Sequence, residues 1–575
     1  MNADNRRPRG VREISTLGTP PGIWSEYKYR TESSVGPLSL ALLSTSDSQS
    51  LKMKNPFGSS KRTPREGPPE IYGFRIYLLV VSATWASAMY GYDSAFIGGT
   101  LALPAFKSTF GLEDASDSET ANLSSNVVSC FQAGAFFGAL IGFFFAERYG
   151  RKPVIIGSGV VFSIGAIVQL VGIMPLIVSS TLIPIYIAEC SPALIRGRLV
   201  GIFEIMLQIA LVFGFWVNYG VERNISGSDP TQWRIPVGIQ LIPAGLLMLS
   251  MPWMIESPRW LASKNRMEKA HESLAWVRNL PMEHEYVVNE LAGIQAAVNH
   301  ELESTGGDRS FAQILRECAA PGVRNRILIS VLLMLLQNLT GINAINYYSP
   351  TIFRSIGFTG TSVQLLATGV YGLVKMFTTL VFMIWIVDRF GRRPPLLVGA
   401  VGAAIAMFYL GIYSQLSGSF EAIPPSDAGA RTAVAMIYIY AIFYGFSWNG
   451  IPWIFASEVL PTRVRTLGMM AAVCMQWLAQ FMIVYSLPHM VETITFGTFY
   501  FFAACTIVAL VFAYLFVPET KGVPLEEMDL LFGPDVSLFA RPARRNYEEA
   551  KEAMRVEGGA GKKHIDDEYT HVEEA

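Results

Sequence analysis

The chain has 575 residues, of which 51% are hydrophobic and 16% charged, and its formal net charge is −1. An ordinary soluble chain carries about 25% charged residues, so this composition argues against that class. The balanced charge gives no general argument for a nucleic-acid partner. The five cysteines form no CxxC pair and fall mostly in apolar runs, so we expect neither a disulfide framework nor a metal site.

Residues 1–72 are polar, rich in Ser, Pro and basic residues, and contain no cleavable signal peptide. We expect this segment to be a disordered tail, because its apolar content is too low to build a core. The first apolar run must then act as the insertion signal.

Twelve apolar runs follow the tail, and most reach the length of about 20 residues that a membrane span needs. The fourth run is marginal. A buried core helix is an alternative for any single run, but not for twelve in series. The runs lie at 74–97, 126–146, 153–172, 174–190, 200–221, 234–255, 327–347, 363–387, 395–415, 433–456, 467–488 and 498–517.

A polar segment at 256–325 separates the sixth run from the seventh and is amphipathic, as in RMEKAHESLAWVRNL at 266–280. It divides the chain into two halves of six runs. The sequence therefore predicts an N-terminal six-helix bundle at 73–255, a helical linker at 256–325, a C-terminal six-helix bundle at 326–517 and a C-terminal tail at 518–575.

The two halves repeat the same signals in the same order, which coincidence does not explain. The pairs are ERYGRK (147–152) with DRFGRR (388–393), AECSPALIRGR (188–198) with SEVLPTRVRTLG (457–468), and ESPRWL (256–261) with PETKGVPLE (518–526). These turns carry Glu147, Arg148, Arg151, Glu189, Arg196, Asp388, Arg389, Arg392, Glu458 and Arg465. By themselves, such charges are expected to set the topology.

With twelve spans, the basic turns, the linker and both tails lie on one side of the membrane. The loop at 107–124, on the other side, carries one Lys against four acids. Because Lys and Arg concentrate in cytoplasmic loops, we expect a plasma-membrane protein with both termini in the cytoplasm. The sequons at Asn122 and Asn224 then face outside, where glycosylation is permitted.

Asp93 and Lys375 lie inside apolar runs, where a charge costs about 2.5–3.5 kcal/mol on insertion scales and indicates function by default. Asp93, in GYDSAFIGG, can load and release a proton if it has no partner; the alternative is a hydrogen-bonded aspartate at a helix end. Lys375 can pair with a substrate carboxylate, pair with a protein carboxylate, or extend to the outer surface.

Polar amides in the seventh run offer hydrogen-bond donors and acceptors to a hydroxylated ligand. They are Gln337, Asn338 and Asn343. Hydrogen bonding between helices is the alternative role of such side chains.

Taken together, nine stretches resemble the sugar porter family of the major facilitator superfamily over about residues 70–530: GYDSAFIGG, ERYGRK, PIYIAECSPALIRGR, ESPRWL, LQNLTGINAINYYSP, DRFGRR, SWNGIPWIFASEVLP, QWLAQF and VPETKGVPLEEM. Within that family, GFWVNYG, NGIPW, NLPMEHEY and YTHVEEA are similar to fungal quinate permeases. Fungal hexose and pentose permeases share much of this vocabulary.

The resemblance implies an all-α membrane protein with the major facilitator fold: twelve transmembrane helices in two six-helix bundles, with the cytoplasmic helical segment between them. It implies transport by alternating access of a small polyhydroxylated solute, quinate or a related acid or sugar, together with a proton. The alternatives are a hexose or pentose carrier and a non-transporting nutrient sensor. The chain shows no nucleophile–base pair, metal cluster or phosphate loop, so we expect neither an enzyme nor a cofactor.

The resemblance also assigns site residues. Asp93 matches the proton-coupling aspartate. Gln208, Gln337, Asn343, Gln476 and Trp477 match sugar-contacting positions, and Asn338 replaces a second glutamine there. Trp453 matches an aromatic residue that stacks on the sugar ring, although anchoring at the lipid interface is its alternative. Gly372 stands where many relatives have Asn. The motif acids and arginines are expected to form ion pairs between the bundles that hold the outward-open state.

One part of the chain departs from the family pattern. The family pairs its aspartate with an arginine early in the fourth span, but residues 171–190 read VGIMPLIVSSTLIPIYIAEC and contain no Arg. Glu147 and Glu189 are 42 residues apart, whereas Asp388 and Glu458 are 70 apart. Either the protein is naturally shortened here or the gene model carries a deletion, and the coupling mechanism stays open.

Overall fold

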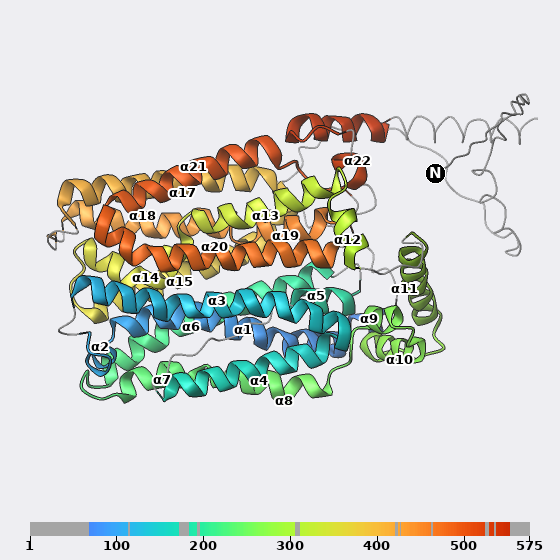
Figure 1. Cartoon of the computed structure of the whole chain (residues 1–575), viewed down its shortest axis with the longest axis horizontal. Coiled ribbons are helices and arrows are strands. Elements are labelled where there is room, and N and C mark those ends of the chain that lie inside the picture. The colour runs from blue at the N-terminus through green and yellow to red at the C-terminus, as the bar shows by residue number, and fades with distance from the viewer. Residues whose placement is uncertain are drawn as a thin grey trace, which may run out of the picture. The chain divides into compact units, whose positions relative to one another are not determined.

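The computed structural model describes residues 68–112, 116–171, 183–192, 196–304, 311–419, 424–425, 427–461, 464–523, 528–533 and 536–552. Every regular element in these ranges is a helix. The long helices run side by side, with those of the first half below those of the second half in Figure 1. Of the predicted disordered tail at 1–72, residues 1–67 lie outside the described residues, and Pro69–Tyr72 form a short helical turn. Most of the shortened stretch, 172–182, also lies outside the described residues.

The first half begins with a short turn and ends with the four helices of the linker. Its elements are η1 (Pro69–Tyr72), α1 (Phe74–Ala102), α2 (Pro104–Thr109), α3 (Asp117–Tyr149), α4 (Arg151–Leu170), α5 (Ile183–Cys190), α6 (Arg196–Asn224), α7 (Thr231–Ile239), α8 (Leu241–Ser250) and η3 (Met251–Trp253). The linker contains α9 (Pro258–Ser263), α10 (Met267–Arg278), α11 (Glu285–Ser304) and α12 (Phe311–Cys318).

The second half has the same alternation of long helices and tight turns. Its elements are α13 (Val323–Leu339), α14 (Ile342–Ser355), α15 (Thr361–Val381), η4 (Phe382–Ile386), α16 (Val387–Phe390), α17 (Arg393–Ser417), α18 (Ala428–Gly445), α19 (Ile451–Val459), α20 (Arg465–Ile494), α21 (Gly497–Phe516) and α22 (Met528–Phe532). A further helix covers 540–552.

Ten stretches of helix in the described part are long and apolar enough to cross a membrane. They correspond to ten of the twelve predicted runs. The fourth run is described only from Ile183, where α5 begins, and the tenth run divides into α18 and α19. The division has a local cause: residues 446–450 form a turn, and Pro452 has no N–H with which to continue a helix through it.

The seventh run is also interrupted, between α13 and α14. Gly341 has φ +93°, a left-handed conformation that favours glycine, and a Cβ there would meet the Phe502 ring at 2.9 Å. The hydroxyl of Tyr440, on α18, donates to the carbonyl of Thr340 next to this break (3.0 Å). In return, Gln337 Nε2 on α13 donates to the carbonyl of Trp448 in the other break (2.8 Å). A carbonyl group at each break therefore accepts a hydrogen bond from the helix that leads into the other break.

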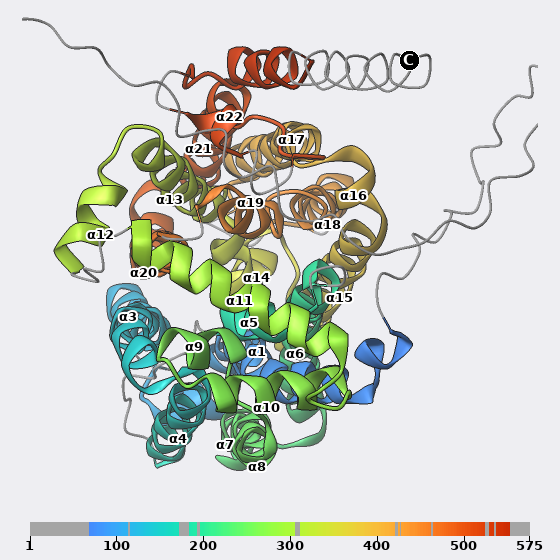
Figure 2. The same cartoon turned by 90° about the vertical axis from the view of Figure 1, so that its right-hand side faces the viewer.

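The halves contact each other along three helix pairs: α1 with α14, α3 with α20, and α6 with α15. The first pair is so close that a Cβ on Gly98 of α1 would coincide with the carbonyl of Tyr347 on α14. Figure 2, viewed along the long helices, shows α9, α10 and α11 across the near end of the bundle. Arg278 of α10 fastens them there, because its Nη1 donates to the carbonyl of Cys190 at the end of α5 (2.9 Å) and its Nη2 pairs with Glu290 (2.6 Å).

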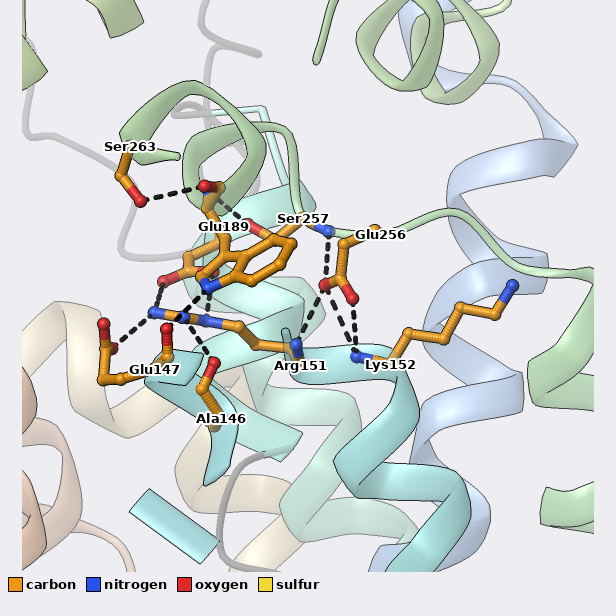
Figure 3. A network of polar contacts seen from close by, with 9 residues as sticks. Ala146, Glu147, Arg151, Lys152, Glu189, Glu256, Ser257 and Ser263 are labelled. Atoms are coloured by element: carbon orange, nitrogen blue, oxygen red, sulfur yellow. Dashed lines mark hydrogen bonds and ion pairs between the residues drawn. The ribbon is translucent and has the colours of Figure 1, made fainter. Parts of the chain in front are cut away.

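A polar network closes the turn between α3 and α4 (Figure 3). Arg151 pairs through Nη2 with Glu189 (3.1 Å) and Glu147 (3.0 Å). Glu256 accepts hydrogen bonds from the backbone N–H groups of Arg151 (3.0 Å) and Lys152 (3.2 Å). Burial raises the pKa of Glu256, and these backbone donors oppose that rise because they favour the charged form.

The second half contains the same network at the turn between α16 and α17. Arg392 Nη2 pairs with Glu458 (2.5 Å), and Glu519 accepts from the backbone N–H groups of Arg392 (3.0 Å) and Arg393 (3.0 Å). The sequence repeat is thus present in the contacts: an arginine pairs with an acid after the fourth or tenth run, and a second acid caps the turn.

These ion pairs differ from the expectation of pairs between the bundles, because Arg151 and Arg392 each bind acids of their own half. Arg148 and Arg389 are exposed and lie over the rings of Tyr149 and Phe390. Arg465 Nε donates to the carbonyl of Leu460 (3.2 Å). The side chains of Arg196 and Asp388 lie outside the described residues, so a gating role for this set stays a prediction.

We predict that Gly150→Ala destabilises the protein by about 1–3 kcal/mol, because Gly150 has φ +108° and a methyl group there would meet the Glu256 carboxylate. The apparent melting temperature of the purified protein would measure this. Gly157→Ala is the matched control: Gly157 is helical and has open space at its Cβ position, so no loss is expected. Equal melting temperatures for the two variants would contradict the prediction.

Candidate binding site between the two halves

A cavity of about 60 Å³ lies between helices of both halves. The first half contributes α1 and α6; the second contributes α13, α14, α15, α18, α20, the turn at 446–450 and α19. One water molecule needs about 10–15 Å³ of such volume, so the cavity has room for a few waters. A ring with several hydroxyl groups requires the lining helices to move apart.

Seven of the eight residues predicted to contact substrate line this cavity. They are Gln208, Gln337, Asn338, Asn343, Lys375, Trp453 and Gln476. The break at Gly341 brings Asn338 and Asn343 together, and Asn343 Nδ2 donates to Asn338 Oδ1 (2.6 Å). The structure thus gathers polar residues from four separate runs, whereas their contact with a substrate stays a prediction.

Trp477 is the exception: it does not line the cavity in this structure, and its contact with a substrate stays a prediction. Successive residues of an α-helix are about 100° apart around its axis, so Gln476 and Trp477 cannot face the same way. Trp477 is buried and packs edge-on against Tyr90 (5.0 Å between ring centroids) and Phe131 (5.6 Å). It supports Tyr90, which does line the cavity. Gln480, one turn along α20, shares the cavity-facing side with Gln476.

Three amide oxygens around the cavity have no hydrogen-bond donor among the described residues: Oε1 of Gln208, of Gln337 and of Gln476. The Nε2 groups of Gln208 and Gln337 are already engaged, with Glu204 and with the carbonyl of Trp448 respectively. A buried acceptor without a donor costs about 1–3 kcal/mol. The cavity is therefore prepared to accept hydrogen bonds from a ligand rich in hydroxyl groups.

Lys375 lies on α15 and is 3% exposed. Its Nζ is 5.9 Å from the centre of the Tyr444 ring, and among the described residues it forms no ion pair. Extension to the outer surface is thus not its role in this structure. An ammonium group in a site of low polarity attracts an anion strongly, because the medium screens the charge poorly.

Glu204 is the residue that sequence reasoning missed. It lines the cavity from α6, and its Oε1 accepts from Gln208 Nε2 (2.8 Å) and Asn449 Nδ2 (2.7 Å). The signal was available, since the rule that selects ionisable residues inside apolar runs applies to Glu204 as well as to Asp93. Seven further polar or aromatic lining residues were also missed: Tyr90, Ser94, Phe203, Asn346, Tyr444, Asn449 and Gln480.

Asp93 does not line the cavity, although the next residue, Ser94, does. The Asp93 side chain is 4% exposed, and neither of its carboxylate oxygens has a hydrogen-bond partner among the described residues. The stretch where the family places its arginine falls within 172–182, outside the described residues. Asp93 is therefore a buried carboxyl group set apart from the polar lining.

A side chain from the first half fills the space beside Gly372. A Cβ at residue 372 would lie 2.7 Å from the ring of Phe215 on α6. A larger side chain at 372 would therefore require Phe215 to shift.

The two predicted glycosylation sites are exposed and helical. Asn122 lies in the second turn of α3, and Asn224 is the last residue of α6. No group of three His, Cys, Asp or Glu side chains within the described ranges is arranged to hold a metal ion.

Comparison with known proteins places this cavity in a family. The family model "Sugar (and other) transporter" matches residues 79–532. The chain is 41% identical over 488 residues to the quinate permease of Neurospora africana, covering 81% of this chain and 90% of that protein. It is 39% identical over 508 residues to a probable quinate permease of Neosartorya fischeri, covering 85% and 92%.

Solved structures agree. The proton:xylose symporter XylE, bound to 6-bromo-6-deoxy-D-glucose, superposes with a TM-score of 0.65 at 26% identity and covers 80% of this chain and 99% of its own. An inward-open XylE from E. coli superposes with a TM-score of 0.62 at 25% identity, covering 80% and 100%. The predicted fold class and the exclusion of an enzyme are thereby confirmed. The chain belongs to the sugar transporter family of the major facilitator superfamily and is a multi-pass membrane transporter.

Proposed function

We propose that the transporter carries a polyhydroxylated monocarboxylic acid, quinate or a close analogue, together with a proton. The observation that carries the proposal is Lys375, a buried ammonium group at the central cavity with no ion pair among the described residues. A carboxylate can form an ion pair with this ammonium group, whereas a neutral sugar cannot. Relatives described as quinate permeases support the same substrate class.

The rest of the lining suits the hydroxyl groups of that acid. The free Oε1 atoms of Gln208, Gln337 and Gln476 accept hydrogen bonds, and each such bond contributes about 1 kcal/mol. Trp453 lines the same cavity and offers an apolar face to the ring.

A hexose or pentose is the second candidate. The observation in its favour is the likeness to XylE, a structure described as a proton:xylose symporter. Against it stands Phe215, which fills the space beside Gly372 where an asparagine side chain would reach a sugar.

Proton coupling is proposed for Asp93. A carboxyl group that is buried and lacks a partner among the described residues binds and releases a proton as its surroundings open to either side. Asp93 lies on α1, next to Ser94 in the cavity wall, so movement of α1 affects both.

We also propose a plasma-membrane location with both termini in the cytoplasm. The excess of Lys and Arg in the repeated turns supports this orientation. It puts Asn122 and Asn224 outside the cell, where both are exposed for glycosylation.

Lys375→Met is expected to weaken quinate uptake at least about tenfold, since it removes a charge-assisted bond of about 1.5–3 kcal/mol, and to weaken glucose uptake much less. Labelled quinate and glucose would be compared in cells that lack their own carriers. Lys264→Met, at an exposed linker lysine, serves as control. Equal losses for both solutes would count against a contact between Lys375 and a carboxylate.

Asp93→Asn is expected to abolish accumulation driven by an external acid pH while quinate exchange across the membrane continues. Asp427→Asn is the matched control, because Asp427 caps α18 and asparagine caps a helix equally well. Uptake would be followed together with external pH. If Asp93→Asn cells still accumulate quinate, the carboxyl group is structural.

Gln476→Leu is expected to raise the half-saturating quinate concentration about fivefold, the equivalent of one hydrogen bond of about 1 kcal/mol. Gln415→Leu removes the same group from an exposed site outside the cavity and should leave uptake unchanged. An unchanged half-saturating concentration in Gln476→Leu would remove this residue from the substrate site.

A further inference from the structure

Among the described residues that line the cavity, one is acidic and one is basic, and they come from different halves: Glu204 from α6 and Lys375 from α15. We propose that Glu204 balances Lys375 in the empty carrier and takes up one proton when a substrate carboxylate binds Lys375. This inference rests on the proposed function, because it requires an acidic substrate.

The two oxygens of Glu204 have different surroundings. Oε1 accepts from Gln208 of the same helix and from Asn449, which lies in the turn between α18 and α19 of the other half. Oε2 forms no hydrogen bond among the described residues. A proton can therefore join Oε2 while Oε1, then a carbonyl oxygen, keeps both of its donors.

Among the described residues, Lys375 is the one cation that acts on the Glu204 carboxylate. From α15 it faces Lys375, from α1 the phenol of Tyr90, and from α18 the phenol of Tyr444. Phenols titrate near pH 10 and carry no charge under physiological conditions. The empty cavity is therefore neutral, with one carboxylate and one ammonium.

The charged residues on α5 and α7, which also pack against α6, do not face the cavity. On α5, Glu189 pairs with Arg151 at the far end of the helix. On α7, the exposed Arg234 lies over the ring of Trp233. Neither supplies a second counter-charge to the cavity.

A bound acid changes this balance. Its carboxylate adds a second negative charge beside Lys375, and an uncompensated charge in a poorly screened site is strongly unfavourable. One proton from water on the loading side restores neutrality by joining Oε2 of Glu204. On unloading, the acid leaves Lys375, the proton returns to water, and Glu204 again balances the ammonium.

Glu204 and Asp93 then have different roles. Asp93 lies outside the cavity, so its proton does not depend on the charge of the solute. The proton on Glu204 does, because a neutral solute leaves Glu204 ionised opposite Lys375. Proton uptake that requires a carboxylate on the solute is the distinguishing property of Glu204.

Calorimetric binding of quinate to the purified full chain, from about pH 5 upward where the quinate carboxylate is ionised, tests this. For the wild type, affinity should fall with rising pH, approaching tenfold per pH unit where Glu204 is ionised in the empty carrier and protonated in the complex. Glu204→Gln, a neutral analogue of the protonated side chain, should bind quinate with no such slope and more tightly than the wild type at the highest pH. Asp93→Asn should keep the wild-type slope.

The methyl ester of quinate is the matched neutral probe, and the wild type should bind it with no slope. A pH indicator in weak buffer supplies a second measurement that needs no variant: the wild type should take up about one proton per quinate bound and none with the ester.

A wild-type slope retained in Glu204→Gln, or no proton uptake with quinate, would overturn the inference and leave the proposed function standing. A slope lost only in Asp93→Asn would assign the proton to Asp93 and overturn it as well. Absence of quinate binding to the wild type at every pH would overturn the proposed function itself.

Discussion

A backbone inside a membrane has no water to bond with, so it leaves the helical conformation only where other protein groups satisfy it. This constraint shapes the centre of the transporter. At Gly341 and at 446–450 the chain departs from the helix, and both departures lie at the cavity. Tyr440 donates to the first and Gln337 to the second. The irregular backbone that forms the site is thus stabilised by two hydrogen bonds. Gln337 of α13 donates one to the turn after α18, and Tyr440 of α18 donates the other to the turn after α13.

The two halves have the same polar contacts at their turns but different residues in the cavity. At the turns, Arg151 with Glu256 and Arg392 with Glu519 repeat one arrangement. In the cavity, the first half supplies an acid and the second a base. The duplicated scaffold therefore fixes the helix ends in the same way twice, while the binding chemistry differs between the copies.

Hydropathy and spacing were enough to predict most of the fold. Runs of about 20 apolar residues can only be satisfied as helices in a membrane, and ten of the twelve appear in the described part as helical stretches long and apolar enough to cross it. The division of the tenth run was not predicted, although Pro452 and the glycines around it signal a break. The donor that satisfies a carbonyl of this turn, Gln337, is distant in sequence.

The sequence predicted the site residues that are polar and lie inside apolar runs. Lys375 and the amides of the seventh run were selected because polar groups in spans need partners. Direction around a helix was less accessible: Trp477 was expected beside Gln476, yet the helical rotation turns it toward Tyr90 and Phe131. Hydrogen bonds between the two halves could not be predicted from the sequence. The bond between Glu204 and Asn449, for example, joins residues 245 positions apart.

The hydrogen bonds that Gln337 and Tyr440 donate to the two breaks have an evolutionary consequence. Replacement of Gln337 removes the donor from a carbonyl on the far helix, and replacement of Tyr440 does the same in the opposite direction. Each position is therefore coupled to the break on the other helix, because loss of its donor leaves a buried carbonyl there unsatisfied unless a nearby change supplies another donor. Glu204 and Lys375 project from continuous helices and carry no such obligation to the backbone. Descendants of this scaffold can thus acquire new solutes by altering charge in the cavity while the interrupted helices stay the same.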